Sequence, residues 1–446
     1  MSIPAFTGLN TALRGVQAQQ AALDTIAHNI ANVETPGYSR QEAVFSSSPS
    51  LRLGAGAKAD GTGAQLGTGV EVTTYRRLRD DFLDLQYRAQ NMAAGQSDVQ
   101  TKRLSVVQAD LASNTDGDLG KLLDKFWSSW DTLAANPNDP SAKAGVVGAA
   151  QTLAQRFNTL DADIATAGAQ ATSAVTDMLS PAGPIKPIAD ELAQLNTQIN
   201  LAQGQGVSPN DLLDRRDLLL DQLSQYGQVS VSADPTLDAA GNPAYPGMVQ
   251  VSFGGAPTPL VSQTTVTMPT AATLSATPGG QLQGLQDVAT KAAGYRTTLA
   301  TMASSLMSSV NSLTSSPIFS GTGANDIAVV ATSATVSAGA AGAAVGDNTV
   351  AGAIAKLRGG TVDQTYAGLV QTIGSDVKTA TNANTTATSV LASITSQRTS
   401  VSGVSMDEEM SNMIRFQRGY QAAARALTTM DDLLNQLINS TGRVGL

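Results

Sequence analysis

Large apolar side chains recur with a seven-residue period at both ends of this chain. Steps of four and three residues run from Leu9 to Ile30 and again from Met406 to Ile438. This period puts the apolar residues on one side of an α-helix and predicts a coiled-coil helix at each end. We call the following residues the seam: Leu9, Leu13, Val16, Gln20, Leu23, Ile30, Met410, Met413, Gln417, Tyr420, Leu427, Leu434 and Ile438.

An isolated helix of this kind is only marginally stable in water, so both predicted helices need a partner. Burying a large apolar side chain contributes about 1.5–3 kcal/mol, which makes an uncovered seam unfavourable. Because the two rows share their period, we expect them to cover each other or to meet neighbouring molecules as a self-assembly seam. Gln20, Gln417 and Asp431 interrupt the rows, and polar residues at such positions set the register of coiled coils.

The interior of the chain is predicted to be mainly helical. Apolar residues recur with helical spacing over 79–226, 282–310 and 350–394. Asp139-Pro140 has the form of an N-cap followed by proline at the first helical position. Trp127 and Trp130 lie within the first block, and we expect both in the core. The period changes to two within 227–268 and 318–336, which predicts short strands inserted into a helical frame.

These patterns predict a mainly α, elongated, multi-domain protein with terminal coiled-coil helices and a helical bundle that carries a small inserted β domain. The terminal coiled-coil domain is expected to be discontinuous and to comprise 1–45 and 402–446. The helical domain comprises 46–226, 281–316 and 346–401, and the small β domain comprises 227–280 and 317–345.

The stretch after the first helix is predicted to be a turn followed by a long connecting arm. Proline and glycine in Thr35-Pro36-Gly37-Tyr38 suit the two central positions of a type II turn. Residues 41–75 are rich in Ser, Gly and Ala, and their glycines do not match a phosphate-binding loop. Three arginines within 76–79 run directly into Asp80 and Asp81, so we interpret them as a solvated helix start.

Composition and charge exclude several classes of function. The 446-residue chain has a net charge of −9, which opposes non-specific nucleic-acid binding because such binding needs basic surface. It has no cysteine, so disulfides, thiolate nucleophiles and cysteine metal sites are excluded. No run of about 18 apolar residues predicts membrane insertion. Residues 1–16 lack the features of a cleavable secretory signal, so we expect a cytoplasmic protein or one exported without a cleaved signal.

No group of residues indicates catalysis, a cofactor or a metal site. The one histidine, His28, lies in an Ala-rich amphipathic run, and we interpret it as a partly exposed helix residue. Asp407, Glu408 and Glu409 stand at the start of the last predicted helix, where acidic side chains complement the helix dipole and cap free amides. We therefore predict a structural protein with no catalytic residues, no cofactor and no metal.

Several stretches resemble a known family. Residues 27–40, AHNIANVETPGYSR, resemble the N-terminal signature of bacterial flagellar axial proteins, and 402–425, SGVSMDEEMSNMIRFQRGYQAAAR, resemble their C-terminal counterpart. In the interior, DLLDRRDLLL at 211–220, GGQL at 279–282 and GTGANDIAV at 321–329 resemble the hook-associated protein 1 family of hook–filament junction proteins. This resemblance runs nearly end to end.

The resemblance implies an assembled structural protein. The terminal helices would form an inner layer that lines an axial channel, with a helical domain outside it and a β domain outermost. The chain would form a homo-oligomer that contacts hook subunits and, on the filament side, a second junction protein. An export chaperone would bind the C-terminal helix, and the unfolded chain would leave the cell by type III export. The implied location is the hook–filament junction of the bacterial flagellum, outside the cell.

Three alternatives remain open, and one of them, a helical-bundle adhesin or sensor, lacks any anchor segment. Another axial subunit, of hook or rod type, would share both terminal signatures, but a hook subunit would lack the long helical block over 79–226. A secreted enzyme carried on axial-like ends would need paired acids in a cleft. The acids available to it, Asp234, Asp238, Asp287, Asp326 and Asp347, are scattered at no useful spacing.

Overall fold

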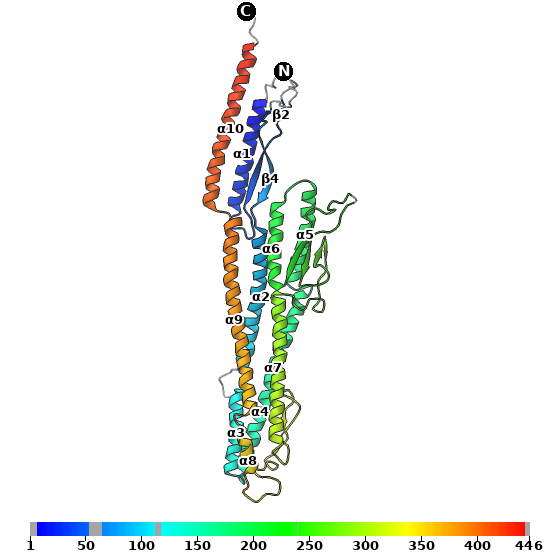
Figure 1. Ribbon diagram of the computed structural model, residues 1–446, viewed down its shortest axis with the longest axis vertical. Helices are drawn as coiled ribbons and strands as arrows, with labels where there is room; N and C mark the ends of the chain where they lie inside the picture. Colours follow the sequence, from blue (N-terminus) through cyan, green and yellow to red (C-terminus); the bar gives the residue numbers. More distant parts are fainter. Residues whose placement is uncertain (1–6, 53–64, 112–116, 239, 442–446) are drawn as a thin grey trace, which may run out of the picture.

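The computed structural model describes residues 7–52, 65–111, 117–238 and 240–441, without the side chains of 51, 52, 65, 437, 438, 440 and 441. The molecule is elongated, and long helices run along its length (Figure 1). The first and last helices lie together at one end, although almost the whole chain separates them in sequence. The predicted mainly α, elongated fold is confirmed.

One end of the molecule, which we call the terminal unit, combines helices and strands from both ends of the chain. It contains α1 (Thr7–Ala31), β1 (Gln41–Ser47), β2 (Leu51–Arg52), β3 (Gln65–Leu66), β4 (Val70–Arg77) and α10 (Met406–Thr441). β1 and β4 pair in antiparallel fashion with an irregularity between Val44 and Phe45, and both strands pack along α1. The stretch predicted to be a long connecting arm therefore contains a pair of strands that belongs to the terminal unit. The alternation of β-branched residues within 70–74 favours a strand, and α1 supplies the surface that it covers.

The rest of the molecule, which we call the rod, is a helical bundle. Its helices are α2 (Asp81–Leu111), α3 (Leu119–Ala135), α4 (Pro140–Leu179), α5 (Ile185–Gly204), α6 (Asn210–Tyr226), α7 (Gly280–Asn311), α8 (Thr349–Ala355) and α9 (Thr361–Ser402). The predicted helical block over 79–226 is confirmed. Asp139 accepts a hydrogen bond from the backbone N of Ser141 at 2.8 Å, and Pro140 is the first helical residue, so the predicted N-cap is also confirmed.

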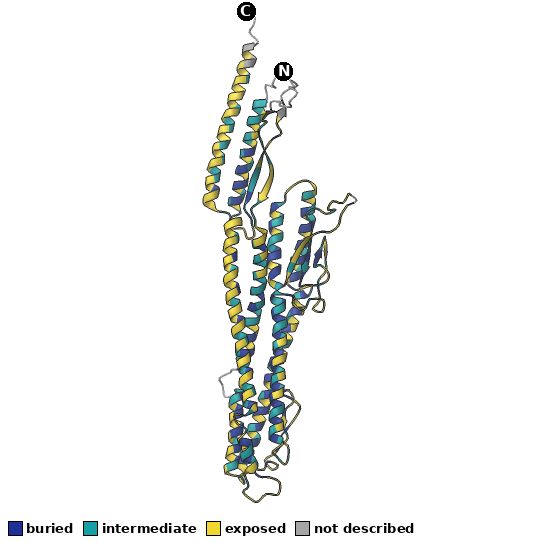
Figure 2. Ribbon diagram, in the orientation of Figure 1, coloured by how far each residue is buried: buried dark blue, intermediate teal, exposed yellow. Residues whose placement is uncertain are grey.

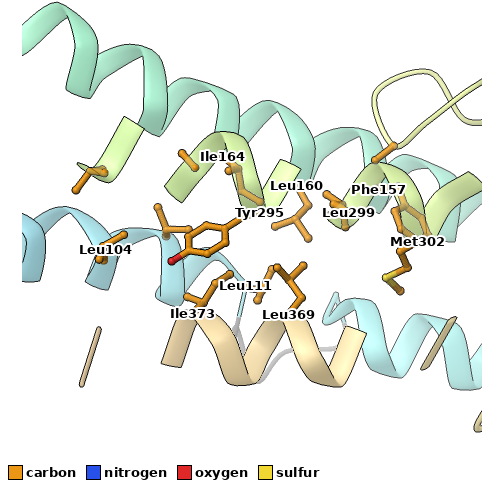
Figure 3. Packing of buried hydrophobic residues seen from close by; sticks show 14 of the residues in the cluster. Leu104, Leu111, Phe157, Leu160, Ile164, Tyr295, Leu299, Met302, Leu369 and Ile373 are labelled. Atoms are coloured by element: carbon orange, nitrogen blue, oxygen red, sulfur yellow. The ribbon is translucent and has the colours of Figure 1, made fainter. Parts of the chain in front are cut away.

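The core runs along the inside of the rod. Figure 3 shows apolar side chains from α2, α4, α7 and α9 converging between these helices. Toward the far end, Trp127 and Trp130 are fully buried, as predicted, and the ring centroid of Phe126 lies 5.0 Å from that of Trp127. Aromatic residues of this size dominate the energetics of a core. The rod therefore has a core of its own, independent of the terminal helices.

The strands of the rod form two separate sheets. β5 (Val229–Ala233), β6 (Val249–Phe253), β7 (Val261–Ser262) and β8 (Thr265–Val266) form an antiparallel sheet in chain order beside α5 and α6, and β9 (Phe319–Ser320) pairs only with β10 (Ala328–Val329). The first sheet leads into the start of α7, while β9 and β10 lie at the far end of that helix (Figure 1). The two predicted pieces of the β domain, 227–280 and 317–345, thus form separate sheets with the 32-residue α7 between them, and the domain limits stay a prediction.

Candidate assembly surface and the joint beside it

The two terminal helices run antiparallel and pack against each other through small residues (Figure 1). A Cβ atom placed on Gly15 would lie 3.6 Å from the Cβ of Ala423, and one on Gly8 would lie 3.3 Å from the side chain of Met430. A step of seven residues along α1 thus corresponds to a step of seven back along α10, which is the spacing of a coiled coil. The predicted pairing of the two ends is confirmed.

The seam lies beside this contact rather than in it. Its half-buried members are Leu9, Val16, Leu23, Ile30, Met413, Leu427 and Leu434, its exposed members are Leu13, Gln20, Met410, Gln417 and Tyr420, and the side chain of Ile438 lies outside the described residues. The residues that meet across the pair lie one position earlier in each row. One residue corresponds to about 100° of rotation on a helix, so the seam lies to one side of the intramolecular contact. The self-assembly role of the seam stays a prediction.

α10 presents large apolar side chains to solvent. Met410 and Ile414 are both 50% exposed, and Leu433 is 55% exposed. Among the described side chains of α10 only that of Glu409 is buried, and the outward side of the helix is exposed along its length (Figure 2). Clusters of exposed apolar residues on a soluble protein mark contact sites. The uncovered face of α10 is therefore the candidate assembly surface.

The chain crosses between the terminal unit and the rod at residues 78–80 and 403–405, and we call this joint the elbow. Both crossings are tied to the start of β1. The backbone N of Leu78 donates to the carbonyl of Arg40, and the backbone N of Arg40 donates to the carbonyl of Ser402, each at 2.8 Å. The two crossings therefore lie side by side.

Glu409 links the last helix to the first one at the elbow. Its side chain is 2% exposed, and its carboxylate lies 2.8 Å from Nε of Arg40 and accepts a hydrogen bond from Nδ2 of Asn29 at 3.2 Å. Asn29 in turn exchanges hydrogen bonds with the backbone of Gln41 at 2.9 and 3.0 Å. Glu409 lies in the first turn of α10, as predicted, but the capping interpretation did not include these partners, which a buried carboxylate needs. Its neighbour Glu408 remains 62% exposed.

A network of arginines and aspartates fills the rest of the elbow. Its members are Arg77, Arg79, Arg88, Arg398, Asp84, Asp211, Asp214, Asp217 and Asp221. The last four aspartates recur every three or four residues on α6, so they share one face of that helix. Arg77 of β4, for example, lies 2.9 Å from Asp214 and 2.8 Å from Asp217. α6 is thus the acidic partner of both the terminal unit and the rod.

The network keeps Asp217 charged. Burial by itself would raise the pKa of Asp217, but the nearby guanidiniums of Arg79 and Arg77 outweigh burial and hold the pKa below its ordinary value. Burial, together with the charge of Asp211, raises the pKa of Tyr38 well above its ordinary value. Tyr38 therefore stays neutral and donates its hydroxyl hydrogen to Oδ1 of Asn29 at 2.7 Å.

The interpretation of the arginines at 76–79 as a solvated helix start holds only for Arg76, whose side chain is 63% exposed. The side chains of Arg77 and Arg79 are 18% and 8% exposed. The acidic partners of Arg77 are 137 and 140 residues away in sequence, so no local pattern around the arginines indicates them. The aspartate spacing within 211–221 was the one available signal.

The turn after α1 and the single histidine match their predictions. Gly37 has φ of 83°, and the backbone N of Tyr38 donates to the carbonyl of Thr35 at 3.2 Å, which are the features of a type II turn. A Cβ on Gly37 would lie 3.0 Å from the Cβ of Leu218, so α6 also packs on this turn. His28 is partly exposed, and its Nε2 lies 3.3 Å from Oδ1 of Asp211.

Four of the acids that an enzyme site would need have structural partners. Asp238, Asp326 and Asp347 accept hydrogen bonds from backbone amides of their own loops, and these bonds lower their pKa values. Asp287 accepts hydrogen bonds from the side chains of Gln96, Gln100 and Gln283. These contacts are those of turn and helix packing. Over the described ranges, no group of three or more His, Cys, Asp or Glu side chains could hold a metal ion, and no helix is long and apolar enough to span a membrane.

Comparison with known proteins defines the class first. Residues 9–38 match the family described as flagella basal body rod protein, and 395–440 match the family described as flagellar basal body rod FlgEFG protein C-terminal. These two matches cover α1 and α10, the helices that pair at the end of the molecule. The chain is therefore a structural protein of the flagellar axial class.

The interior then selects the family. Residues 104–318 match the flagellar hook-associated protein FlgK helical domain. The flagellar hook-associated protein 1 of Bacillus subtilis (strain 168) is 30% identical over 98% of this chain and 98% of its own length. That of Salmonella typhimurium (strain LT2) is 34% identical over 50% of this chain and 39% of its own. The chain belongs to the flagellar hook-associated protein 1 family, whose members are structural proteins and not enzymes.

A solved structure is also similar in part. The flagellar hook junction protein FlgK from Burkholderia pseudomallei is 24% identical, with a TM-score of 0.42, over 53% of this chain and 46% of that chain.

Proposed function

We propose that this chain polymerises at the distal end of the flagellar hook and forms the junction to which the filament attaches. The observation that carries the proposal is the uncovered apolar face of α10. The terminal pair closes through small residues and leaves Met410, Ile414 and Tyr420 in solvent at 50%, 50% and 37% exposure. Each such side chain contributes about 1.5–3 kcal/mol when another surface buries it, so assembly stabilises a face that the monomer leaves exposed.

The partners follow from this position. Copies of the chain meet through the seam, hook subunits lie on one side, and a second junction protein lies on the filament side. Before assembly an export chaperone covers the exposed face of α10, and the chain leaves the cell unfolded through the type III apparatus. The location is the hook–filament junction, outside the cell. The alternative is a subunit of the flagellar hook or of the flagellar basal body rod. The matches of residues 9–38 and 395–440 to basal body rod families favour it.

The domain organisation follows the same layers. The terminal helices form an inner layer around the axial channel, and the rod stands outside it. We change two of the limits proposed from the sequence. The division after residue 45 cuts β1 and separates it from its partner β4, and the last helix begins at Met406 rather than at 402. We place β1 to β4 with the terminal helices, so that this unit comprises residues 1–77 and 406–446.

A strain that lacks residues 407–446 tests the function. We expect hooks without filaments and filament subunits released into the medium. A sharper version replaces Met410 and Ile414 by glutamate, which puts two charges on the exposed face without touching the α1 contact. The matched control replaces Thr290 and Thr297, exposed residues of α7, by glutamate. Normal filaments on the Met410/Ile414 variant would contradict the proposed assembly surface.

A further inference from the structure

The elbow is held from one side only. On the side of α9 lies an open groove of about 840 Å³, lined by Leu391, Thr395 and Thr399 of α9, by the 403–405 crossing, and by Arg40 and Glu408. On the opposite side stands the N-terminal half of α6. Two short crossings beside an open groove do not by themselves fix an angle between two helical units, so other contacts must fix it.

α6 makes these contacts through polar groups that are almost all buried. The carboxylate of Asp214 accepts a hydrogen bond from the backbone N of Ser39 at 2.9 Å. Asn210 donates to Oε1 of Gln41 at 3.0 Å and to the carbonyl of Tyr75 at 2.9 Å. Asn210, Asp214, Ser39 and Gln41 are all buried. Hydrogen bonds between buried groups have narrow geometry, because a group that loses its partner stays desolvated and unpaired.

The same face of α6 also holds the rod. Asp217 and Asp221 pair with Arg88 of α2 at 3.3 and 2.8 Å, and Asp221 pairs with Arg398 of α9 at 2.6 Å. Arg77 of β4 shares Asp217 with Arg88. One helix face therefore carries alternate contacts to the terminal unit and to the rod, and neither unit can rotate about the elbow without breaking ion pairs to α6.

We propose that the acidic face of α6 is a clamp that locks the elbow of the free subunit at one angle. The clamp makes the direction of the rod a property of the folded monomer, before any neighbour is present. This inference goes beyond the proposed function, since it concerns the isolated chain and stands or falls independently of where the chain assembles.

The absence of cysteine allows a direct test by double spin labelling. Thr385 of α9 and Gln421 of α10 are both exposed and lie on opposite sides of the elbow. Their separation along the two helices is about 50 Å at 1.5 Å per residue. This distance lies within the range of pulsed electron–electron double resonance. The full chain with Thr385→Cys and Gln421→Cys, diluted with unlabelled protein to remove contacts between copies, should give a single narrow distance distribution.

Arg77→Met and Arg88→Met form a matched pair of variants. Each removes one partly buried guanidinium and two ion pairs to α6, and the two side chains are 18% and 14% exposed. Only Arg77 reaches across the elbow. We expect Arg77→Met to broaden the distance distribution at least twofold and Arg88→Met to leave its width unchanged. Equal broadening in both variants, no broadening in either, or a broad distribution in the parent would each overturn the clamp.

Gln41→Met keeps the test decisive if Arg77→Met does not fold. It removes the hydrogen bonds to Asp211 and Asn210 without a change of charge. The clamp predicts broadening here as well, with an unchanged circular dichroism melting curve for the rod. An unchanged width in a folded Gln41→Met variant would overturn the proposal.

Discussion

Glu408 and Glu409 both pair with Arg40, yet their side chains are 62% and 2% exposed. Removing one partner of a buried ion pair leaves a desolvated charge and costs about 3–5 kcal/mol, whereas an exposed pair contributes about 0–1 kcal/mol. We expect Glu409→Ala to lower the free energy of unfolding of the terminal unit by about 3 kcal/mol, because Arg40 keeps some solvent contact. Glu408→Ala should lower it by less than about 1 kcal/mol. Urea denaturation of both variants checks this, and equal losses would contradict it.

Asp217 makes the stability of the elbow depend on pH. Its pKa in the folded chain lies below the value of about 3.9 for an unfolded aspartate. Its contribution is therefore present above pH about 4 and is lost as the pH falls through the folded pKa. Asp217→Asn should lower stability at pH 7 and make the decline below pH 4 shallower. Urea midpoints between pH 7 and pH 2.5 measure both effects.

Asp98→Asn is the control for this acid profile. Asp98 pairs with Lys102 one turn away, and the lysine side chain is 72% exposed. An exposed pair of this kind contributes little, so the profile should match that of the parent. A variant at Asp98 as sensitive as the one at Asp217 would show that general charge, rather than the elbow network, sets the acid response.

At the scale of the helix, α2 and α7 approach so closely that a glycine is required between them. A Cβ on Gly284 would lie 2.6 Å from the carbonyl oxygen of Gln96, whereas Gly294, further along α7, has nothing within 4 Å. Gly284→Ala must push two backbones apart and should cost about 1–3 kcal/mol. Gly294→Ala should instead stabilise the rod by about 0.5–1 kcal/mol through higher helix propensity. Thermal unfolding by circular dichroism compares the two, and a stabilising Gly284→Ala would contradict the close approach.

The same preference for small residues explains which helical contacts the sequence could reveal. Helix positions, the N-cap at Asp139 and the buried Trp127 follow from local rules, and the structure confirms them. The rows of large residues on α1 and α10 predicted that the ends would pair, but the contact itself runs through Gly15 and Ala423. Large apolar residues indicate where a helix needs cover, while close contact favours small residues on the adjacent face. A count of large residues therefore finds the partner helix but misplaces the contact by one position.

The contacts of the elbow could not be predicted from the sequence for a different reason. Its ion pairs join residues that are far apart in sequence. Arg398 and Asp221 are 177 positions apart, and Arg40 and Glu408 are 368 positions apart. Sequence spacing reports on neighbours within one helix or strand, so the arginines at 76–79 were interpreted as solvated and Glu408 and Glu409 as capping residues. Only the fold shows that the stretches at 27–40, 211–220 and 402–425 meet at one joint.

For the whole molecule, burial predicts an uneven stability along its length. In the rod, Trp127, Trp130 and Phe157 are fully buried, whereas among the described side chains of α10 only Glu409 is buried. Amide exchange follows local opening, which is easy where few apolar contacts hold a helix and approaches the global free energy of unfolding in a packed core. We expect fast exchange over α10 and slow exchange over α3 and α4 in the soluble monomer, measured by mass spectrometry on the full-length chain.

Polymerisation should reduce this difference in exchange rate, and that reduction distinguishes an assembly surface from a frayed helix. When a neighbouring copy covers Met410, Ile414 and Tyr420, their apolar area is removed from solvent. Opening α10 would expose this area again, so the free energy of opening rises. Exchange over α10 should therefore slow by at least tenfold in the assembled state, which corresponds to about 1.4 kcal/mol, while α3 and α4 change little. The Met410/Ile414 double glutamate variant should keep the monomer rates at every concentration. An α10 that is already as protected as α4 in the monomer would show that the helix is stable without a partner and would remove the energetic reason for assembly through this face.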